Sequence, residues 1–80
     1  MSAEVVIVST SGCHLCEQAN RAIGLMGARV RRVDIFSPEG RELVRVHRTA
    51  LVPIIIVDGR LVSSGRFDRS EVARALAECA

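Results

Sequence analysis

Apolar residues follow two patterns along the chain, one typical of strands and one typical of helices. Residues 4–10, EVVIVST, form a continuous apolar run rich in β-branched side chains, and its length fits a strand buried on both faces. Polar residues then interrupt the run. Further along, apolar side chains recur at helical spacing, at Leu15, Ala19, Ala22, Ile23 and Met26. The pattern therefore predicts a buried strand that leads into an amphipathic helix.

The middle of the chain predicts a second strand and a second helix. Residues 28–36, ARVRRVDIF, favour a strand. Ser37 is a good N-cap and Pro38 is a good first helical residue, so we expect a helix from this point to about residue 48.

The last part of the chain predicts a hairpin and a closing helix. Residues 51–59, LVPIIIVDG, favour an apolar strand that ends in an Asp58–Gly59 turn, and residues 60–64 favour the returning strand. Asp68 and Glu71 form a capping-box pattern, which predicts that a final helix begins there.

The predicted order of elements, βαβαββα, indicates an α/β fold with a four-stranded mixed sheet and three helices. A strand–helix–strand unit implies a right-handed parallel crossover, and the hairpin adds an antiparallel pair. The first and third strands show no polar alternation, so we expect helices on both faces of the sheet. A chain of 80 residues has room for one core, and residues 1–80 are predicted to form a single domain.

Pro53 lies near the start of an apolar run that is predicted to be an interior strand. Proline cannot donate a hydrogen bond to a strand ladder, so we expect Pro53 at the first position of the strand. A special backbone geometry, such as a cis Val52–Pro53 bond, suits this position.

Charge and composition exclude several classes of function. A net charge of +2 is too small for a surface that binds nucleic acid. Phe36 and Phe67 are the only Phe, Tyr or Trp side chains that could stack on bases. The apolar run Val5–Val8 is far too short for a signal segment or a membrane span. An odd number of cysteines, three in all, does not suit a secreted disulfide scaffold. We therefore expect a soluble cytoplasmic protein that binds neither nucleic acid nor membranes.

Cys13 and Cys16 form the most informative motif of the sequence, CHLC. Such a pair can belong to a metal site, to an inert structural pair or to a redox pair. A zinc knuckle normally needs four ligands, and the remaining candidates, His14, His47 and Cys79, have no matching spacing. An inert structural pair is disfavoured, because burial alone would not place a cysteine at the N-terminus of a helix. The spacing therefore favours a redox pair and leaves the other two readings open.

The position of CHLC between a strand and a helix indicates what its cysteines do. Cys13, at the first helical turn, would face free backbone N–H groups such as those of Leu15 and Cys16, and these donors favour a thiolate. Cys16 would lie one turn deeper, close enough to form a disulfide. One exposed thiolate with one sheltered partner is what thiol–disulfide exchange requires. His14 either adds a partial positive charge beside the thiolate or is an ordinary solvated side chain.

These features together resemble those of glutaredoxins and glutaredoxin-like proteins of the thioredoxin superfamily. The motif CHLC after a strand, the later LVPIIIVDG and the closing helix are similar to their minimal thioredoxin-like fold over nearly the whole chain. The resemblance implies that Cys13 is the nucleophile and that Cys16 is the resolving cysteine. It also implies that a cis Val52–Pro53 bond faces the disulfide and serves as the backbone platform for the substrate.

The sequence departs from that of glutathione-using glutaredoxins. The STSG stretch before Cys13 lacks their basic residue, His14–Leu15 replaces their frequent Pro-Tyr, and residues 63–68, SSGRFD, replace their Gly-Gly and acidic pair. SSGRFD is more similar to the Ser-Gly-Phe region of redoxins that take electrons from thioredoxin reductase. We therefore expect glutathione to be a poor reductant, although Arg48 or Arg66 could supply a positive charge.

The predicted function is the reduction of protein disulfides by thiol–disulfide exchange. We expect a monomer without cofactor or metal, a disulfide-containing protein as substrate, and a reductase or glutathione as electron source. The alternative is a redoxin-type module that binds an iron–sulfur cluster or a metal between two copies through Cys13. His47 and Cys79 are not expected to contribute. The residues expected to bind substrate are His14, Val52, Pro53, Ser64 and Gly65.

Overall fold

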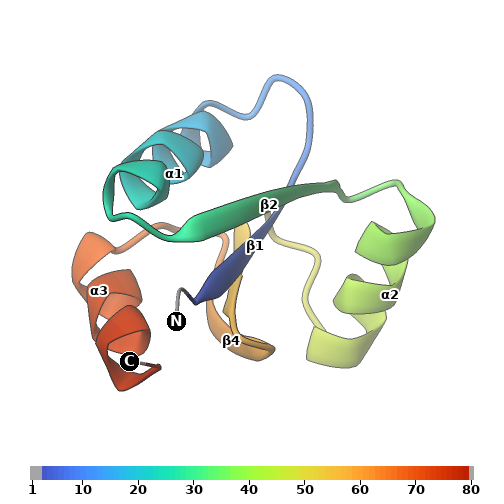
Figure 1. Cartoon of the computed structure of the whole chain (residues 1–80). Helices are drawn as coiled ribbons and strands as arrows, with labels where there is room; N and C mark the ends of the chain where they lie inside the picture. Colours follow the sequence, from blue (N-terminus) through green and yellow to red (C-terminus); the bar gives the residue numbers. More distant parts are fainter. Residues whose placement is uncertain (1–2, 80) are drawn as a thin grey trace.

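The computed structural model describes residues 3–79 and confirms the predicted order of elements (Figure 1). In chain order they are β1 (Glu4–Ser9), α1 (His14–Leu25), β2 (Arg29–Asp34), α2 (Pro38–His47), β3 (Ile54–Val57), β4 (Arg60–Ser64) and α3 (Arg69–Glu78). β1 pairs in parallel with β2 and antiparallel with β3, and β3 pairs antiparallel with β4. The sheet is therefore four-stranded and mixed, with the strand order β2-β1-β3-β4.

Helices cover both faces of the sheet, as the missing polar alternation predicts (Figure 1). On the face of α1 and α3 the core consists of Val5, Ile7, Ala19, Ile23, Ile55, Val57 and Val72. On the face of α2 it consists of Val6, Val8, Val33, Ile54 and Ile56. Successive residues of a strand point to opposite faces, so a strand covered on both faces must be apolar at every covered position, as Val5–Val8 of β1 and all of β3 are.

The Asp58–Gly59 turn joins β3 to β4 as predicted. Both residues have positive φ angles, 47° and 85°, as a type I′ hairpin turn requires. The ladder between the two strands shifts register between Ile55 and Ile56. One extra residue of β4 is accommodated there as a bulge, which the sequence did not predict.

α2 approaches the end of β2 closely at Gly40. A Cβ atom at this position would lie 2.1 Å from the backbone oxygen of Asp34, so the approach requires a residue without a side chain. Ser37 caps α2 as predicted, and its Oγ accepts a hydrogen bond from the Gly40 N–H at 3.0 Å. β2 ends at Asp34, earlier than predicted, because the Asp34 carboxylate accepts the N–H of Phe36 at 2.8 Å and turns the chain.

The predicted capping box at the start of α3 is only half formed. The Asp68 Oδ1 accepts hydrogen bonds from the N–H groups of Ser70, at 2.8 Å, and Glu71, at 3.3 Å. The Glu71 carboxylate bonds to Arg66 and does not return to the backbone of Asp68. Asp68 therefore caps the helix alone.

Candidate active site

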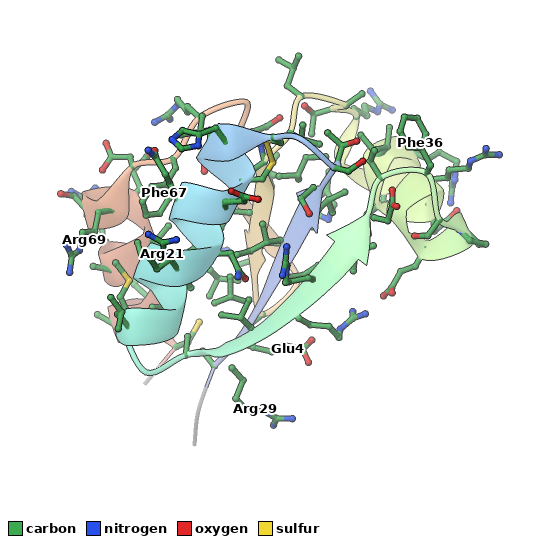
Figure 2. The ribbon with its side chains drawn as sticks, turned by 90° about the horizontal axis from the view of Figure 1, so that it is seen from above. Glu4, Arg21, Arg29, Phe36, Phe67 and Arg69 are labelled. Atoms are coloured by element: carbon green, nitrogen blue, oxygen red, sulfur yellow. A yellow bond between two sulfur atoms is a disulfide. The ribbon has the colours of Figure 1, made fainter. Side chains whose placement is uncertain are left out.

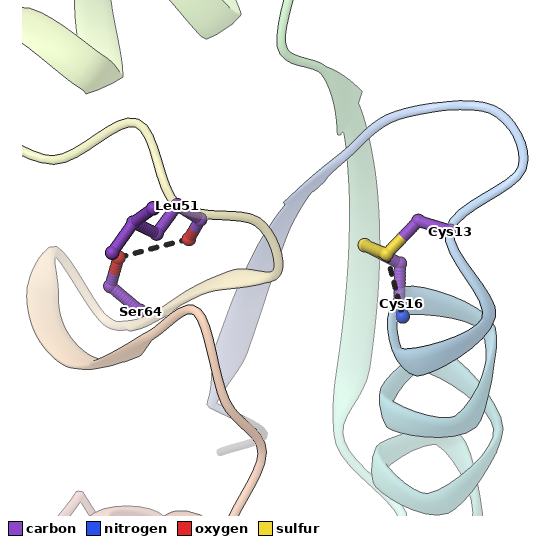
Figure 3. The surroundings of a disulfide bond; sticks show 4 residues. All are labelled: Cys13, Cys16, Leu51 and Ser64. Atoms are coloured by element: carbon purple, nitrogen blue, oxygen red, sulfur yellow. Dashed lines mark hydrogen bonds between the residues drawn. A yellow bond between two sulfur atoms is a disulfide. The ribbon is translucent and has the colours of Figure 1, made fainter.

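Cys13 is the N-cap residue of α1. Its backbone is extended, with φ −90° and ψ 103°, and its Sγ accepts a hydrogen bond from the Cys16 N–H at 3.1 Å (Figure 3). The first N–H groups of a helix have no partner within the helix, so this sulfur takes the place of a capping oxygen. A negatively charged acceptor binds such a donor more strongly than a neutral one does. The Cys16 N–H faces the Cys13 sulfur, as one of the two donors expected from the sequence.

Cys16 lies one turn into α1, on the buried side of the helix. Its exposed fraction is 4%, whereas Cys13 is partly exposed. A disulfide joins the two residues, whose Cα atoms are 5.2 Å apart, and Figure 2 shows it at the start of α1. The pair therefore has one accessible and one sheltered sulfur.

Pro53 stands at the edge of the sheet from which the chain also leaves β1 toward Cys13. Val8 of β1 pairs with Ile54, the first residue of β3, and Ile54 pairs with Ser64, the last residue of β4. Three segments therefore meet at this edge of the sheet: the loop that carries Cys13, the residues before β3 and the end of β4. The Val52–Pro53 bond is cis, as expected, but Pro53 lies directly before β3, which begins one residue later than expected.

Val52 has backbone groups that are available to a partner. Within residues 3–79, neither its N–H nor its C=O takes part in the strand ladders or in a backbone hydrogen bond. Its neighbour Leu51 exposes 66% of its surface. In Figure 3 the disulfide points toward the loop that carries Leu51. An extended peptide could pair with Val52 as an added strand.

Ser64 and Gly65 hold the residues that precede β3. The Ser64 hydroxyl donates a hydrogen bond to the Leu51 oxygen at 2.9 Å (Figure 3). The Gly65 N–H donates to the Pro53 oxygen at 3.2 Å. Gly65 has a φ angle of 76°, and a Cβ atom there would lie 3.0 Å from the Leu51 Cβ. The structure therefore brings both residues against the segment that carries Val52.

Thr49 belongs to the same region, although the sequence did not single it out. Its Oγ1 forms a hydrogen bond with the Ser64 Oγ. The same Oγ1 accepts the Leu51 N–H at 3.4 Å. No sequence signal marks Thr49, because the contact depends on how β3 and β4 pair.

His14 and Arg66 are both engaged by neighbouring side chains. His14, the exposed first residue of α1, has its Nε2 3.2 Å from the Gln18 Nε2. Arg66 bonds through both terminal nitrogens to the Glu71 carboxylate, and these hydrogen bonds raise the pKa of Arg66. Arg66 is therefore paired with Glu71 in this structure.

β2 brings a positive charge next to the STSG stretch, which the sequence did not predict. A cavity of about 280 Å³ is lined by Ser9, Thr10, Ser11, Arg32, Val33 and Asp34. The stretch directly before Cys13 has no basic residue of its own, but Arg32 of the neighbouring strand β2 lies beside it. Asp34 lines the same cavity, and its negative charge opposes the binding of an anion there.

Cys79 lies at the C-cap of α3, near the end of β3 that is opposite to Pro53. Together with Arg60 and Arg74 it lines a cavity of about 180 Å³ between β4 and α3. Hydrogen bonding with the Asp58 carboxylate, followed by burial, raises the pKa of the Cys79 thiol. A raised pKa keeps this cysteine in its less reactive thiol form near neutral pH.

The described part of the chain contains neither a metal-binding cluster nor a membrane-spanning helix. Within residues 3–79, no group of three or more His, Cys, Asp or Glu side chains is placed to hold a metal ion. No helix of this part is long and apolar enough to cross a membrane. His47, at the end of α2, and Cys79, after α3, lie on different elements from the cysteine pair.

Comparison with solved structures shows that the fold is thioredoxin-like. The NrdH-redoxin of Escherichia coli, described as a glutaredoxin-like protein with a thioredoxin-like activity profile, aligns with a TM-score of 0.71 and 21% identity, covering 89% of this chain and 92% of its own. A mutant thioredoxin from Halobacterium salinarum aligns with a TM-score of 0.69 and 16% identity, covering 96% of this chain and 74% of its own. Buckwheat glutaredoxin in complex with glutathione aligns with a TM-score of 0.69 and 18% identity, covering 94% of this chain and 77% of its own. No family model and no curated protein matches the chain. At these identities the likeness establishes a thioredoxin-like fold and nothing further.

Proposed function

We propose that this protein is a thiol–disulfide oxidoreductase that reduces protein disulfides through Cys13 and Cys16. The observation that carries the proposal is the position of Cys13 at the start of α1, where its Sγ accepts the Cys16 N–H. A thiolate at a helix N-terminus with a sheltered cysteine one turn away suits thiol–disulfide exchange. The thioredoxin-like fold supports the same function.

In the reduced protein, the Cys13 thiolate attacks one sulfur of the substrate disulfide. A bond forms between the Cys13 Sγ and this sulfur, and the disulfide bond of the substrate breaks. The other substrate sulfur leaves as a thiolate and takes up a proton from water. The product of this step is a mixed disulfide between Cys13 and the substrate.

Cys16 then resolves the mixed disulfide. Its thiol loses a proton, its sulfur attacks the Cys13 Sγ, and the second substrate sulfur leaves as a thiolate. The products are a reduced substrate and a Cys13–Cys16 disulfide, so two electrons have passed from the protein to the substrate. Cys16 is 4% exposed, which hinders a substrate disulfide from reaching it first and fixes the order of the two attacks.

The substrate is held beside the cysteine pair by the residues before β3. The N–H and C=O groups of Val52 pair with an extended stretch of the substrate, in the manner of an added strand. Pro53 keeps these groups at the sheet edge that also carries Cys13. The exposed His14 adjoins Cys13 and contributes to the contact with the substrate.

The electron source in this proposal is a protein reductase, in preference to glutathione. SSGRFD, residues 63–68, lacks the glycine pair and the acidic cap of glutathione-using glutaredoxins. Arg66, one of the candidate partners for a glutathione carboxylate, forms an ion pair with Glu71, which competes for it. A role as a monomeric electron donor suits the cytoplasm, where thiols are kept reduced.

Reduction of insulin by dithiothreitol, followed as turbidity of the released chains, tests this proposal. The wild-type protein should accelerate the reaction, and Cys13→Ser should abolish the acceleration. Cys79→Ser is the matched control and should keep the wild-type rate. Equal rates for the wild type and Cys13→Ser would contradict the proposal. Visible absorbance of freshly purified protein, together with a doubled native mass, would support the iron–sulfur alternative instead.

A further inference from the structure

The hydroxyl groups of Thr49 and Ser64 close a ring of hydrogen bonds around the loop between α2 and β3. The Ser64 hydroxyl donates its one proton to the Leu51 oxygen at 2.9 Å. The contact between the two hydroxyls must then use the Thr49 proton, with the Ser64 Oγ as acceptor. The Leu51 N–H donates to the Thr49 Oγ1 at 3.4 Å and completes the ring. Each proton in the ring has one acceptor, and such chains of hydrogen bonds reinforce one another.

The ring lies at the edge of the sheet that carries the cysteine pair. Ser64 pairs with Ile54, and Ile54 pairs with Val8, which lies just before the loop leading to Cys13. Figure 3 shows the Ser64–Leu51 hydrogen bond in the surroundings of the disulfide. The ring of hydrogen bonds therefore joins β4 to the loop between α2 and β3. This loop borders the site and has no regular secondary structure of its own.

We propose that Thr49 and Ser64 are positioning residues, which fix Leu51 and Val52 for the binding of a protein substrate. This inference rests on the proposed function. The Ser64 hydroxyl is used within the protein, so it acts through Leu51 and does not itself touch the substrate. That role differs from the direct substrate contact predicted from the sequence.

The ring acts by reducing the freedom of the loop before substrate arrives. A partner that pairs with the Val52 backbone must find its N–H and C=O in one orientation, and ordering a loop during binding weakens the affinity. Without the Ser64 hydroxyl, the Leu51 oxygen and the Thr49 hydroxyl both lose their partner. One hydrogen bond of this kind is equivalent to about a threefold to tenfold change in binding.

Steady-state kinetics with insulin as the protein substrate test the proposal. Ser64→Ala and Thr49→Val each remove one hydroxyl, and each should raise KM for insulin about threefold to tenfold with a smaller change in kcat. Thr49→Ser keeps the hydroxyl and should restore KM. Combining Ser64→Ala with Thr49→Val should add little to either single change, because both open the same ring.

Ser63→Ala is the matched control. Ser63 adjoins Ser64 in β4, and its hydroxyl donates to the Arg66 oxygen at 3.2 Å, so this variant also loses one side-chain hydrogen bond. It should leave KM for insulin unchanged even if it lowers stability. Hydrogen exchange provides a readout that needs no activity, since the Leu51 amide should exchange faster in Ser64→Ala than in Ser63→Ala.

The outcomes separate this inference from the proposed function. If the wild type reduces insulin but Ser64→Ala and Thr49→Val keep its KM, the inference is overturned and the proposed function stands. Equal Leu51 exchange in Ser64→Ala and Ser63→Ala would also overturn the inference. If the wild type does not reduce insulin, the proposed function fails and the inference fails with it.

Discussion

Replacement of Gly40 by alanine should destabilise the protein, although alanine is ordinarily the better residue in a helix. The new methyl group would lie 2.1 Å from the Asp34 oxygen, and the two atoms must separate by about 1 Å before the contact is tolerable. α2 would have to move away from the sheet, where it covers Val33 and Ile54. Overpacking costs about 1–3 kcal/mol, and a 2.1 Å contact with a backbone oxygen, which no side-chain rotation can relieve, belongs at the upper end of this range. Alanine recovers at most about 1 kcal/mol through its helix propensity.

Gly24→Ala is the matched control for this prediction, because no atom lies within 4 Å of the position of its Cβ. Gly24 is exposed and lies within α1, so the same change should stabilise the protein by about 0.5–1 kcal/mol. Thermal unfolding of the oxidised protein measures both effects, since 1 kcal/mol shifts Tm by about 4–8 °C in a domain of this size. Gly40→Ala should therefore lower Tm by about 5 °C or more, while Gly24→Ala raises it. A Tm for Gly40→Ala at or above that of the wild type would refute the packing of α2 described above.

Three further predictions concern single groups and the electron source. Asp58→Asn should speed the alkylation of Cys79 by iodoacetamide at about pH 8, because it removes the carboxylate that raises the pKa of this thiol; an unchanged rate would contradict the assignment. Glu42 should titrate below the ordinary carboxyl range in the folded protein, because its hydrogen bond with Arg45 lowers its pKa, and Arg45→Gln should return it to that range. A lowered folded-state pKa means that the pair favours folding above the unfolded-state pKa, and that this contribution is lost as pH falls through the lowered value. Turnover with glutathione and glutathione reductase should be slower than turnover with NADPH and thioredoxin reductase; equal rates would contradict the prediction drawn from residues 63–68.

The features that could be predicted from the sequence are those that neighbouring residues determine. An apolar run without alternation is enough to predict that a strand is covered on both faces, as β1 and β3 are. The Asp58–Gly59 turn follows from the ease with which these residues adopt positive φ. The contact of the Cys13 sulfur with a helix N–H follows from its place between a strand and a helix.

The features that could not be predicted depend on contacts between distant segments. Thr49 meets Ser64 only because β3 and β4 pair in one register, and a bulge in β4 alters that register. Arg32 reaches the loop before Cys13 because β2 lies beside β1. Glu71 matched the capping-box pattern, but the side chain of Arg66 competes for its carboxylate. A single sequence carries no local signal for any of these contacts.

Trapping of the mixed disulfide tests most directly the claim that Cys13 is the attacking cysteine. The double variant Cys16→Ser/Cys79→Ser keeps Cys13 as its only thiol and lacks the resolving sulfur. After reduction, removal of the reductant and incubation with insulin, intact-mass analysis and peptide mapping should find an insulin chain bound to Cys13 through a disulfide. The matched variant Cys13→Ser/Cys79→Ser, which keeps only the buried Cys16, should form its adduct much more slowly. An adduct that forms on Cys16 at least as fast as on Cys13 would contradict the assignment of the two roles.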